Sequence, residues 1–408
     1  MNKRGLMIII ISALCLISLA GAEEKESGSK IEPKLIYEKR FDFEIEQGKI
    51  GDDGSIFPTI FVTKDNRALF TDKKGRTLKI LDGNTDIVKV TEDGKNLITA
   101  KYTGDEQRKK EVWMITIYGL LGEIIEKKSI AFNQGYLSDI FLDPTTKNVA
   151  VFLSGSDFTS PYGIAFYDKH LNLLKLYTAG DFERPIVPGS IWKNLGLEFQ
   201  LQSKNGQYLI GIGDNDQSCA IYVFDIGKSE LLYSRYFDTL LIGSAMISND
   251  GSILACVTCH SLRRIIRDGI KNCGIFLTII DIPANDWRFV PLSQKFYSTI
   301  IPPRPHIVFS SNGKYFAFAY GDTLLIYDCN TYNFTNWGGF GADQIVVLSC
   351  SDKGVVVAKN KNEAIMVDKT RTIKWRRQFT KEIIDAHFST DMRRLNVLLV
   401  NGIQIFSF

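Results

Sequence analysis

The sequence lacks the short motifs that mark many enzymes. It contains no G-x-S-x-G, no G-x-x-x-x-G-K-[ST] and no dinucleotide-binding fingerprint. It also has only four histidines, and they fall in unrelated segments: His170, His260, His306 and His387. We therefore expect no hydrolytic or phosphate-binding site, and we assign no catalytic residue and no metal.

Charge of one sign and long apolar runs are also scarce. The formal net charge of the 408 residues is +3, whereas bulk nucleic-acid binding needs a strongly basic face. Beyond residue 22, no apolar run approaches the roughly 20 residues that cross a bilayer. We expect no nucleic-acid partner and no membrane span in the mature chain.

The N-terminal residues have the pattern of a signal peptide, assigned to 1–22. Lys3 and Arg4 precede the apolar stretch Leu6–Leu19, and Ala20-Gly21-Ala22 supplies small residues before a cut at Glu23. The alternative is an uncleaved N-terminal anchor. Residues 23–33 form a polar tether, and we expect a secreted, periplasmic or cell-surface protein whose remaining residues, 34–408, form one domain.

What the chain has in abundance is a repeated strand pattern. In Phe309–Asp328, apolar strands are separated by turns at Asn312-Gly313 and Gly321-Asp322, and Asn-Gly between apolar runs predicts a hairpin. Turns between first and second strands recur eight times: Asp65-Asn66, Asp93-Gly94, Lys147-Asn148, Asn205-Gly206, Asp250-Gly251, Asn312-Gly313, Lys353-Gly354 and Thr390-Asp391. Third strands also number eight: Thr77–Asp82, Val112–Tyr118, Tyr162–Asp168, Ala220–Asp225, Gly274–Asp281, Thr323–Asp328, Glu363–Asp368 and Gly402–Phe408.

A reiterated four-strand unit predicts an all-β fold, a single β-propeller. Eight blades is the expected number, and seven is the alternative, because the first unit has little room for a fourth strand after Asp82. The last unit ends at Phe408 without a fourth strand. We expect the N-terminal strand Lys34–Glu46 to supply it and to close the ring.

The repeats resemble the WD-repeat and quinoprotein-like propeller superfamily. Ile365–Trp375 is similar to the tryptophan-docking repeat of the quinoprotein group, and Leu324–Trp337 is a looser copy. Arg371 occupies the place of the docking glycine, and most units lack the tryptophan. The resemblance covers nearly all of the mature chain and implies the fold, but it does not imply the enzyme activity of the quinoprotein group.

The cysteines leave several alternatives open. Cys256, Cys259 and His260 match C-x-x-C-H, the attachment signature of c-type haem, although the motif falls within a repeat strand. A Cys259–Cys273 disulfide across the following insert is a second alternative, and a zinc site that adds Cys273 to the motif is a third. Alternation along a strand argues against zinc, because Cys256 and Cys259 should face opposite sides.

The insert Ser261–Asn272 mixes cations with apolar residues, and its basic residues form a candidate partner-binding loop: Arg263, Arg264, Arg267 and Lys271. The alternative is a solvated loop. We expect a monomeric, non-catalytic exported propeller that binds an unidentified protein or small ligand and has no cofactor. A redox protein of quinoprotein or c-type haem type is the second hypothesis.

Overall fold

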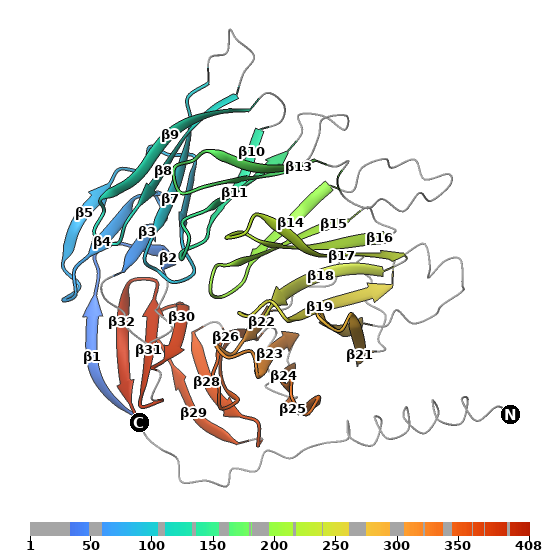
Figure 1. The fold of residues 1–408 in the computed structure, drawn as a ribbon. Coiled ribbons are helices and arrows are strands. Elements are labelled where there is room, and N and C mark those ends of the chain that lie inside the picture. Colours follow the sequence, from blue (N-terminus) through green and yellow to red (C-terminus); the bar gives the residue numbers. More distant parts are fainter. Residues whose placement is uncertain are drawn as a thin grey trace, which may run out of the picture.

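The computed structural model describes residues 33–48, 59–104, 111–132, 136–154, 163–178, 181, 196–214, 218–238, 240–260, 275–293, 306–320, 323–337, 345–360, 362–370, 372–389 and 392–408. These residues form β-strands and turns, arranged as eight antiparallel sheets of four strands around a common centre (Figure 1). No helix among the described residues is long and apolar enough to cross a membrane.

The first four blades follow the chain in order, each from its inner to its outer strand. Blade 1 contains β2 (Ile45–Gly48), β3 (Ile60–Thr63), β4 (Ala68–Thr71) and β5 (Thr77–Leu81), and blade 2 contains β6 (Ile87–Val90), β7 (Leu97–Tyr102), β8 (Glu111–Tyr118) and β9 (Ile124–Phe132). Blade 3 contains β10 (Tyr136–Leu142), β11 (Val149–Ser154), β12 (Gly163–Tyr167) and β13 (Leu173–Thr178), and blade 4 contains β14 (Gly196–Gln202), β15 (Tyr208–Asp214), β16 (Ser218–Asp225) and β17 (Glu230–Asp238).

Blades 5 to 7 repeat the same order. Blade 5 contains β18 (Leu240–Ile247), β19 (Ile253–His260), β20 (Ile275–Asp281) and β21 (Asp286–Ser293), and blade 6 contains β22 (His306–Phe309), β23 (Tyr315–Tyr320), β24 (Thr323–Asp328) and β25 (Asn333–Trp337). Blade 7 contains β26 (Val346–Cys350), β27 (Val355–Asn360), β28 (Glu363–Asp368) and β29 (Ile373–Gln378).

Blade 8 joins the two ends of the chain. It contains β30 (Ile383–Phe388), β31 (Arg394–Leu399) and β32 (Gly402–Ser407), and its outer strand is β1 (Lys34–Arg40). The register pairs Lys34 with Ser407 and Arg40 with Gly402. The predictions of eight blades and of closure by the N-terminal strand are both confirmed.

The prediction for the first unit was wrong by one strand. Lys34–Glu46 is not a single strand, because the chain turns inward after Arg40 and begins β2 at Ile45. The amides of Phe41 and Ile45 donate to the carbonyls of Asn401 and Val400, and the Phe41 ring stacks 4.9 Å from that of Phe43. These contacts carry the chain from the outside of blade 8 to the inside of blade 1.

This shift gives blade 1 its missing fourth strand. Thr77–Leu81 is the outer strand β5, not the third strand, and the Asp65-Asn66 turn joins β3 to β4. Asp72, directly after β4, caps the following turn by accepting from the amides of Lys74 and Arg76 at 2.8 Å. The same capping occurs after the third strands of blades 3 to 7, at Asp168, Asp225, Asp281, Asp328 and Asp368.

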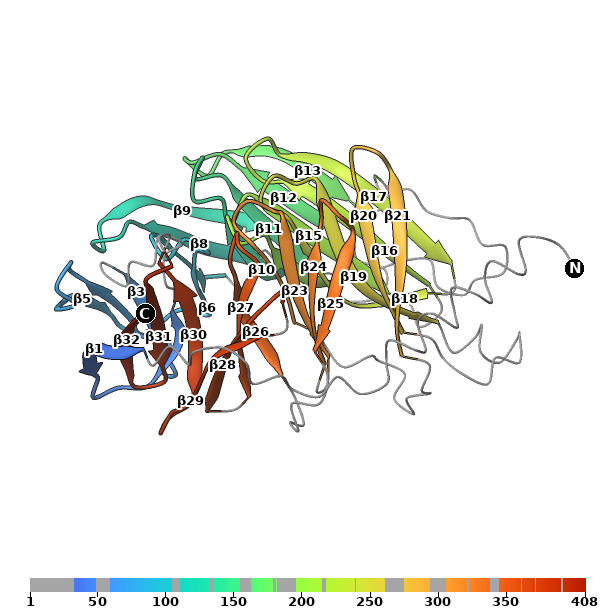
Figure 2. The ribbon, with the colours of Figure 1, turned by 90° about the horizontal axis from the view of Figure 1, so that it is seen from below.

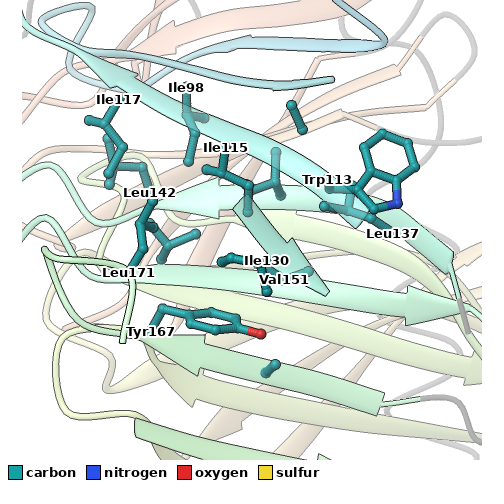
Figure 3. Close-up of a cluster of buried hydrophobic side chains, with 14 of the residues drawn as sticks. Ile98, Trp113, Ile115, Ile117, Ile130, Leu137, Leu142, Val151, Tyr167 and Leu171 are labelled. Atoms are coloured by element: carbon teal, nitrogen blue, oxygen red, sulfur yellow. The ribbon is translucent and has the colours of Figure 1, made fainter. Parts of the chain in front are cut away.

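Buried apolar side chains form eight clusters, and each cluster fills the space between two neighbouring blades. Figure 3 shows the cluster of blades 2 and 3, where Ile98, Ile115 and Ile117 pack against Leu137, Leu142 and Val151. Alternate residues of one strand serve opposite interfaces. On β19, Leu254 and Cys256 face blade 4, whereas Ala255 and Val257 face blade 6. Because both faces of each sheet are covered, the strands are apolar on both sides.

Candidate functional site

A cavity of about 380 Å³ lies at the centre of the ring. The inner strands of five blades, β30, β2, β6, β10 and β14, contribute to its wall. The lining residues are Glu46, Gln47, Gly48, Lys89, Val90, Thr91, Glu92, Ile98, Ile140, Phe141, Leu142, Gln202, Ile384 and Asp385. Strands from distant parts of the sequence therefore enclose one space, which is of a size that suits a small ligand.

Lys89 spans the interface between blades 2 and 3 in the cavity wall. Its Nζ lies 2.5 Å from Asp139 Oδ1 and 3.8 Å from the centre of the Phe141 ring. The ion pair largely cancels this positive charge. Glu46, Glu92 and Asp385 also line the cavity, so carboxylates outnumber cations among its lining residues.

Two β-bulges shape the wall where blade 8 meets blade 1. The register shifts by one residue between Ile45 and Gln47 on β2, and between Ile383 and Asp385 on β30. A bulge leaves one residue unpaired and redirects the neighbouring side chains. The bulged residues, Glu46 and Ile384, and the residues that follow them all line the cavity.

Asp385 and His387 form a buried pair on β30. Asp385 Oδ1 accepts from the Ala386 amide at 2.9 Å and lies 3.2 Å from His387 Nε2. Both residues are 9% exposed. Among the described residues there is no group of three side chains arranged to hold a metal ion.

The two cysteines of the C-x-x-C-H motif lie on β19 and are not brought together. Cys256 is fully buried among residues of blades 4 and 5, and Cys259 packs into the cluster of blades 5 and 6. Burial raises the pKa of the Cys256 thiol to about 12, so this sulfur is neutral at physiological pH. His260 ends the strand, where its backbone pairs with Leu240.

The remaining sequence-predicted residues lie outside the described part of the chain. These are Cys273, Arg263, Arg264, Arg267 and Lys271, together with the segments 1–22 and 23–32. The strands on either side of the insert are described: Cys259 pairs with Ile275, and His260 with Leu240 at the start of β18. The insert is thus attached at the rim where the inner strand of blade 5 begins.

Sequence reasoning did not single out the cavity residues. The available signal was a charge within a short, otherwise apolar first strand, as Lys89 in Ile87–Val90 and Asp385 in Ile383–Phe388. That signal does not say which charged residues face each other, because the five strands are separated by up to about 340 positions in the chain.

Comparisons with known proteins agree on the architecture. No protein-family profile and no curated protein sequence matches the chain. Among solved structures, BamB from Moraxella catarrhalis is similar with a TM-score of 0.52 and 10% identity, covering 92% of this chain and 100% of that one. The Dos1 propeller has a TM-score of 0.52 and 10% identity, covering 94% of this chain and 96% of that one. The Kuenenia stuttgartiensis hydrazine synthase has a TM-score of 0.48 and 13% identity, covering 95% of this chain and 99% of that one.

The fold and the comparisons together define the class of protein. The chain is an eight-bladed β-propeller, in agreement with the resemblance to the WD-repeat and quinoprotein-like superfamily. At 10% identity these similarities establish the fold alone, because one fold hosts many functions.

Proposed function

We propose that this protein is an exported, non-catalytic binding propeller whose central cavity holds a small ligand or a segment of a partner protein. The observation that carries the proposal is the cavity of about 380 Å³ walled by inner strands of five blades. Strands packed on both faces cannot easily shift, so the wall presents its polar groups in fixed positions.

The lining favours a ligand with an apolar body and a positively charged or donor-rich end. Val90 and Phe141 supply apolar surface, whereas Glu46 and Asp385 supply carboxylates. The excess of carboxylates over cations in the lining favours a cationic group over an anionic one.

Titration of the folded protein with arginine and with citrate tests this proposal. We expect arginine to raise the midpoint of thermal unfolding and citrate to leave it unchanged, because a ligand that binds only the native state stabilises it. Glu46→Gln combined with Glu92→Gln should weaken the arginine effect. Glu230→Gln, on the outer strand β17, is the control for the loss of a carboxylate outside the cavity. Equal effects of arginine on all variants, or no effect on the native protein, would contradict the proposal.

Export is the second part of the proposal, and it rests on the signal-peptide pattern of residues 1–22. Expression in an exporting host followed by N-terminal sequencing tests it. We expect the released protein to begin at Glu23. A chain that keeps Met1 and stays in the membrane fraction would support the anchor alternative.

The redox hypothesis remains a prediction based on the C-x-x-C-H motif. An absorption spectrum of protein from an exporting host that can attach haem separates the two hypotheses. A Soret band would replace the non-catalytic proposal with a haem protein. A colourless protein in which mass spectrometry finds Cys256 and Cys259 unmodified would remove the haem alternative.

A further inference from the structure

The outer strands of three consecutive blades form a surface that the cavity does not explain. These strands are β1 of blade 8, β5 of blade 1 and β9 of blade 2, and we name their outer surface the β1–β5–β9 flank. Together with the turn before β9 it exposes a row of large apolar side chains: Ile36, Tyr37, Leu78, Ile80, Leu121, Ile124 and Ile125. The outer strand β13 of the next blade continues this row with three exposed leucines. Ile80 and Ile124 are 51% and 54% exposed. Exposed aliphatic side chains that gather on one surface mark an interaction site.

The three strands form one continuous surface. Lys39 Nζ on β1 donates to the carbonyl of Gly75, in the turn that leads into β5. Lys79 Nζ on β5 donates to the carbonyl of Gly122 at 2.6 Å, in the turn that leads into β9. Figures 1 and 2 both show β1, β5 and β9 on the same side of the ring.

The flank is basic, although the whole chain is nearly neutral. Its strands carry six cations and two anions: Lys34, Lys39, Arg40, Lys79, Lys127 and Lys128 against Glu38 and Glu126. The outer strands of blades 4, 5 and 6 carry two cations and three anions: Arg235 and Arg288 against Glu230, Asp238 and Asp286. Arg40 lies 3.2 Å from Glu38, but solvent weakens this pair because the arginine side chain is 79% exposed. The positive charge is therefore concentrated on one side of the ring, which also includes β29 of blade 7 with Lys374, Arg376 and Arg377.

The position of the N-terminus adds an independent reason to look at this surface. β1 begins at Lys34, 15 positions after the end of the apolar stretch Leu6–Leu19. The intervening residues 23–33 can span at most about 40 Å when extended. Until the signal peptide is cut, residues 23–33 therefore hold β1 and its neighbours within this distance of the membrane that the chain crosses.

We propose that the β1–β5–β9 flank docks on an anionic lipid surface. Exposed aliphatic side chains insert at the boundary between headgroups and acyl chains, while lysine and arginine side chains contact lipid phosphates and other anionic headgroups. Lys34 and Lys127 are exposed at the two ends of the flank and serve as its outermost cationic contacts.

Co-sedimentation with vesicles tests the docking. The protein released by an exporting host is mixed at low salt with vesicles of phosphatidylglycerol and phosphatidylcholine, or of phosphatidylcholine alone. We expect binding only to the anionic vesicles. Lys34→Glu combined with Lys127→Glu should reduce the partition coefficient at least about tenfold, because each reversal replaces an attraction with a repulsion. The matched control is Lys314→Glu with Lys353→Glu, which changes the net charge equally at exposed turns of blades 6 and 7.

A second pair of variants separates docking from simple charge attraction. Ile80→Ser with Ile124→Ser should weaken binding to anionic vesicles without changing the net charge. The thermal transition of each variant, compared with that of the native protein, shows that its fold is intact. Equal binding to phosphatidylcholine vesicles, equal binding by the flank and control variants, or preferential binding of a DNA duplex through the same lysines would overturn the proposal.

Discussion

The guanidinium carbon of Arg235, on the outer strand of blade 4, lies 3.7 Å from the centre of the Trp287 ring on the outer strand of blade 5. Each of the seven remaining blade interfaces has a comparable contact near its outer edge. The pairs are Lys39 with Gly75, Lys79 with Gly122, Lys128 with Asn172, Leu231 with Tyr177, Arg288 with Tyr332, Thr335 with Lys369, and Arg377 with Phe406. The ring is thus closed by polar or cation–π contacts at the outside as well as by apolar clusters within.

The Arg235–Trp287 contact should stabilise the fold measurably. In a double-mutant cycle with Arg235→Met and Trp287→Leu, we expect a coupling energy of about 0.5–1 kcal/mol, the usual strength of a partly exposed cation–π pair. Urea unfolding of the four proteins measures it. Arg235→Lys should keep part of the coupling. Additive effects of the two substitutions would show that the contact contributes nothing.

A second set of contacts joins the turns that connect the first and second strands of neighbouring blades. The Asn205 amide donates to Asn249 Oδ1 at 3.0 Å, and Asn249 Nδ2 donates to the Ser311 carbonyl at 3.1 Å, so one side chain links blades 4, 5 and 6. We expect Asn249→Ala to lower the free energy of unfolding by about 1–2 kcal/mol, because two hydrogen bonds are lost. Asn249→Asp keeps the acceptor and should lose less. Identical stabilities of both variants and the native protein would contradict this role.

Closure by β1 predicts a specific cross-link. Glu38 pairs with Gln404 in the β1–β32 register, although 366 positions separate them. Glu38→Cys with Gln404→Cys should form a disulfide under oxidising conditions and raise the free energy of unfolding by about 2–4 kcal/mol. Non-reducing peptide mapping detects the bond. Lys34→Cys with Gln404→Cys is the out-of-register control and should stay unlinked; the opposite result would show a different register.

The buried thiol of Cys256 should be unreactive while the protein is folded. With its pKa raised to about 12 by burial, the thiolate population at pH 8 is about one in ten thousand, and the thiolate is the reactive form. We expect iodoacetamide at pH 8 to leave Cys256 unmodified in the native protein and to alkylate it after urea unfolding, as read by mass spectrometry. Rapid alkylation of the native protein would show that the blade 4–5 interface opens readily.

The repeat made most of this fold predictable. Short turns such as Asn312-Gly313 require a left-handed residue, and Gly313 has φ of +69° in the structure. Third strands that end in aspartate mark the next turn, because the carboxylate accepts from backbone amides two or more residues on. Blade 1 was assigned wrongly because the alternating pattern of Lys34–Glu46 continues through the bend at Phe41, and alternation alone does not show that a strand has ended.

The cavity was not predictable in the same way. Lys89 belongs to a short strand whose local pattern is that of any inner strand, and its partners Asp139 and Phe141 come from the next blade. The bulges at Glu46 and Ile384 have no clear local signature either, since a bulge depends on pairing with a second strand.

By itself the sequence determined the four-stranded blade, the number of blades and the closure of the ring. Period-two apolar alternation and turn residues are local properties that repeat along the chain. Only the tertiary structure decided which side chains share the central cavity, and that the cations of β1, β5 and β9 share one flank. These are relations between residues far apart in the chain, and they exist only once the blades have packed around a common axis.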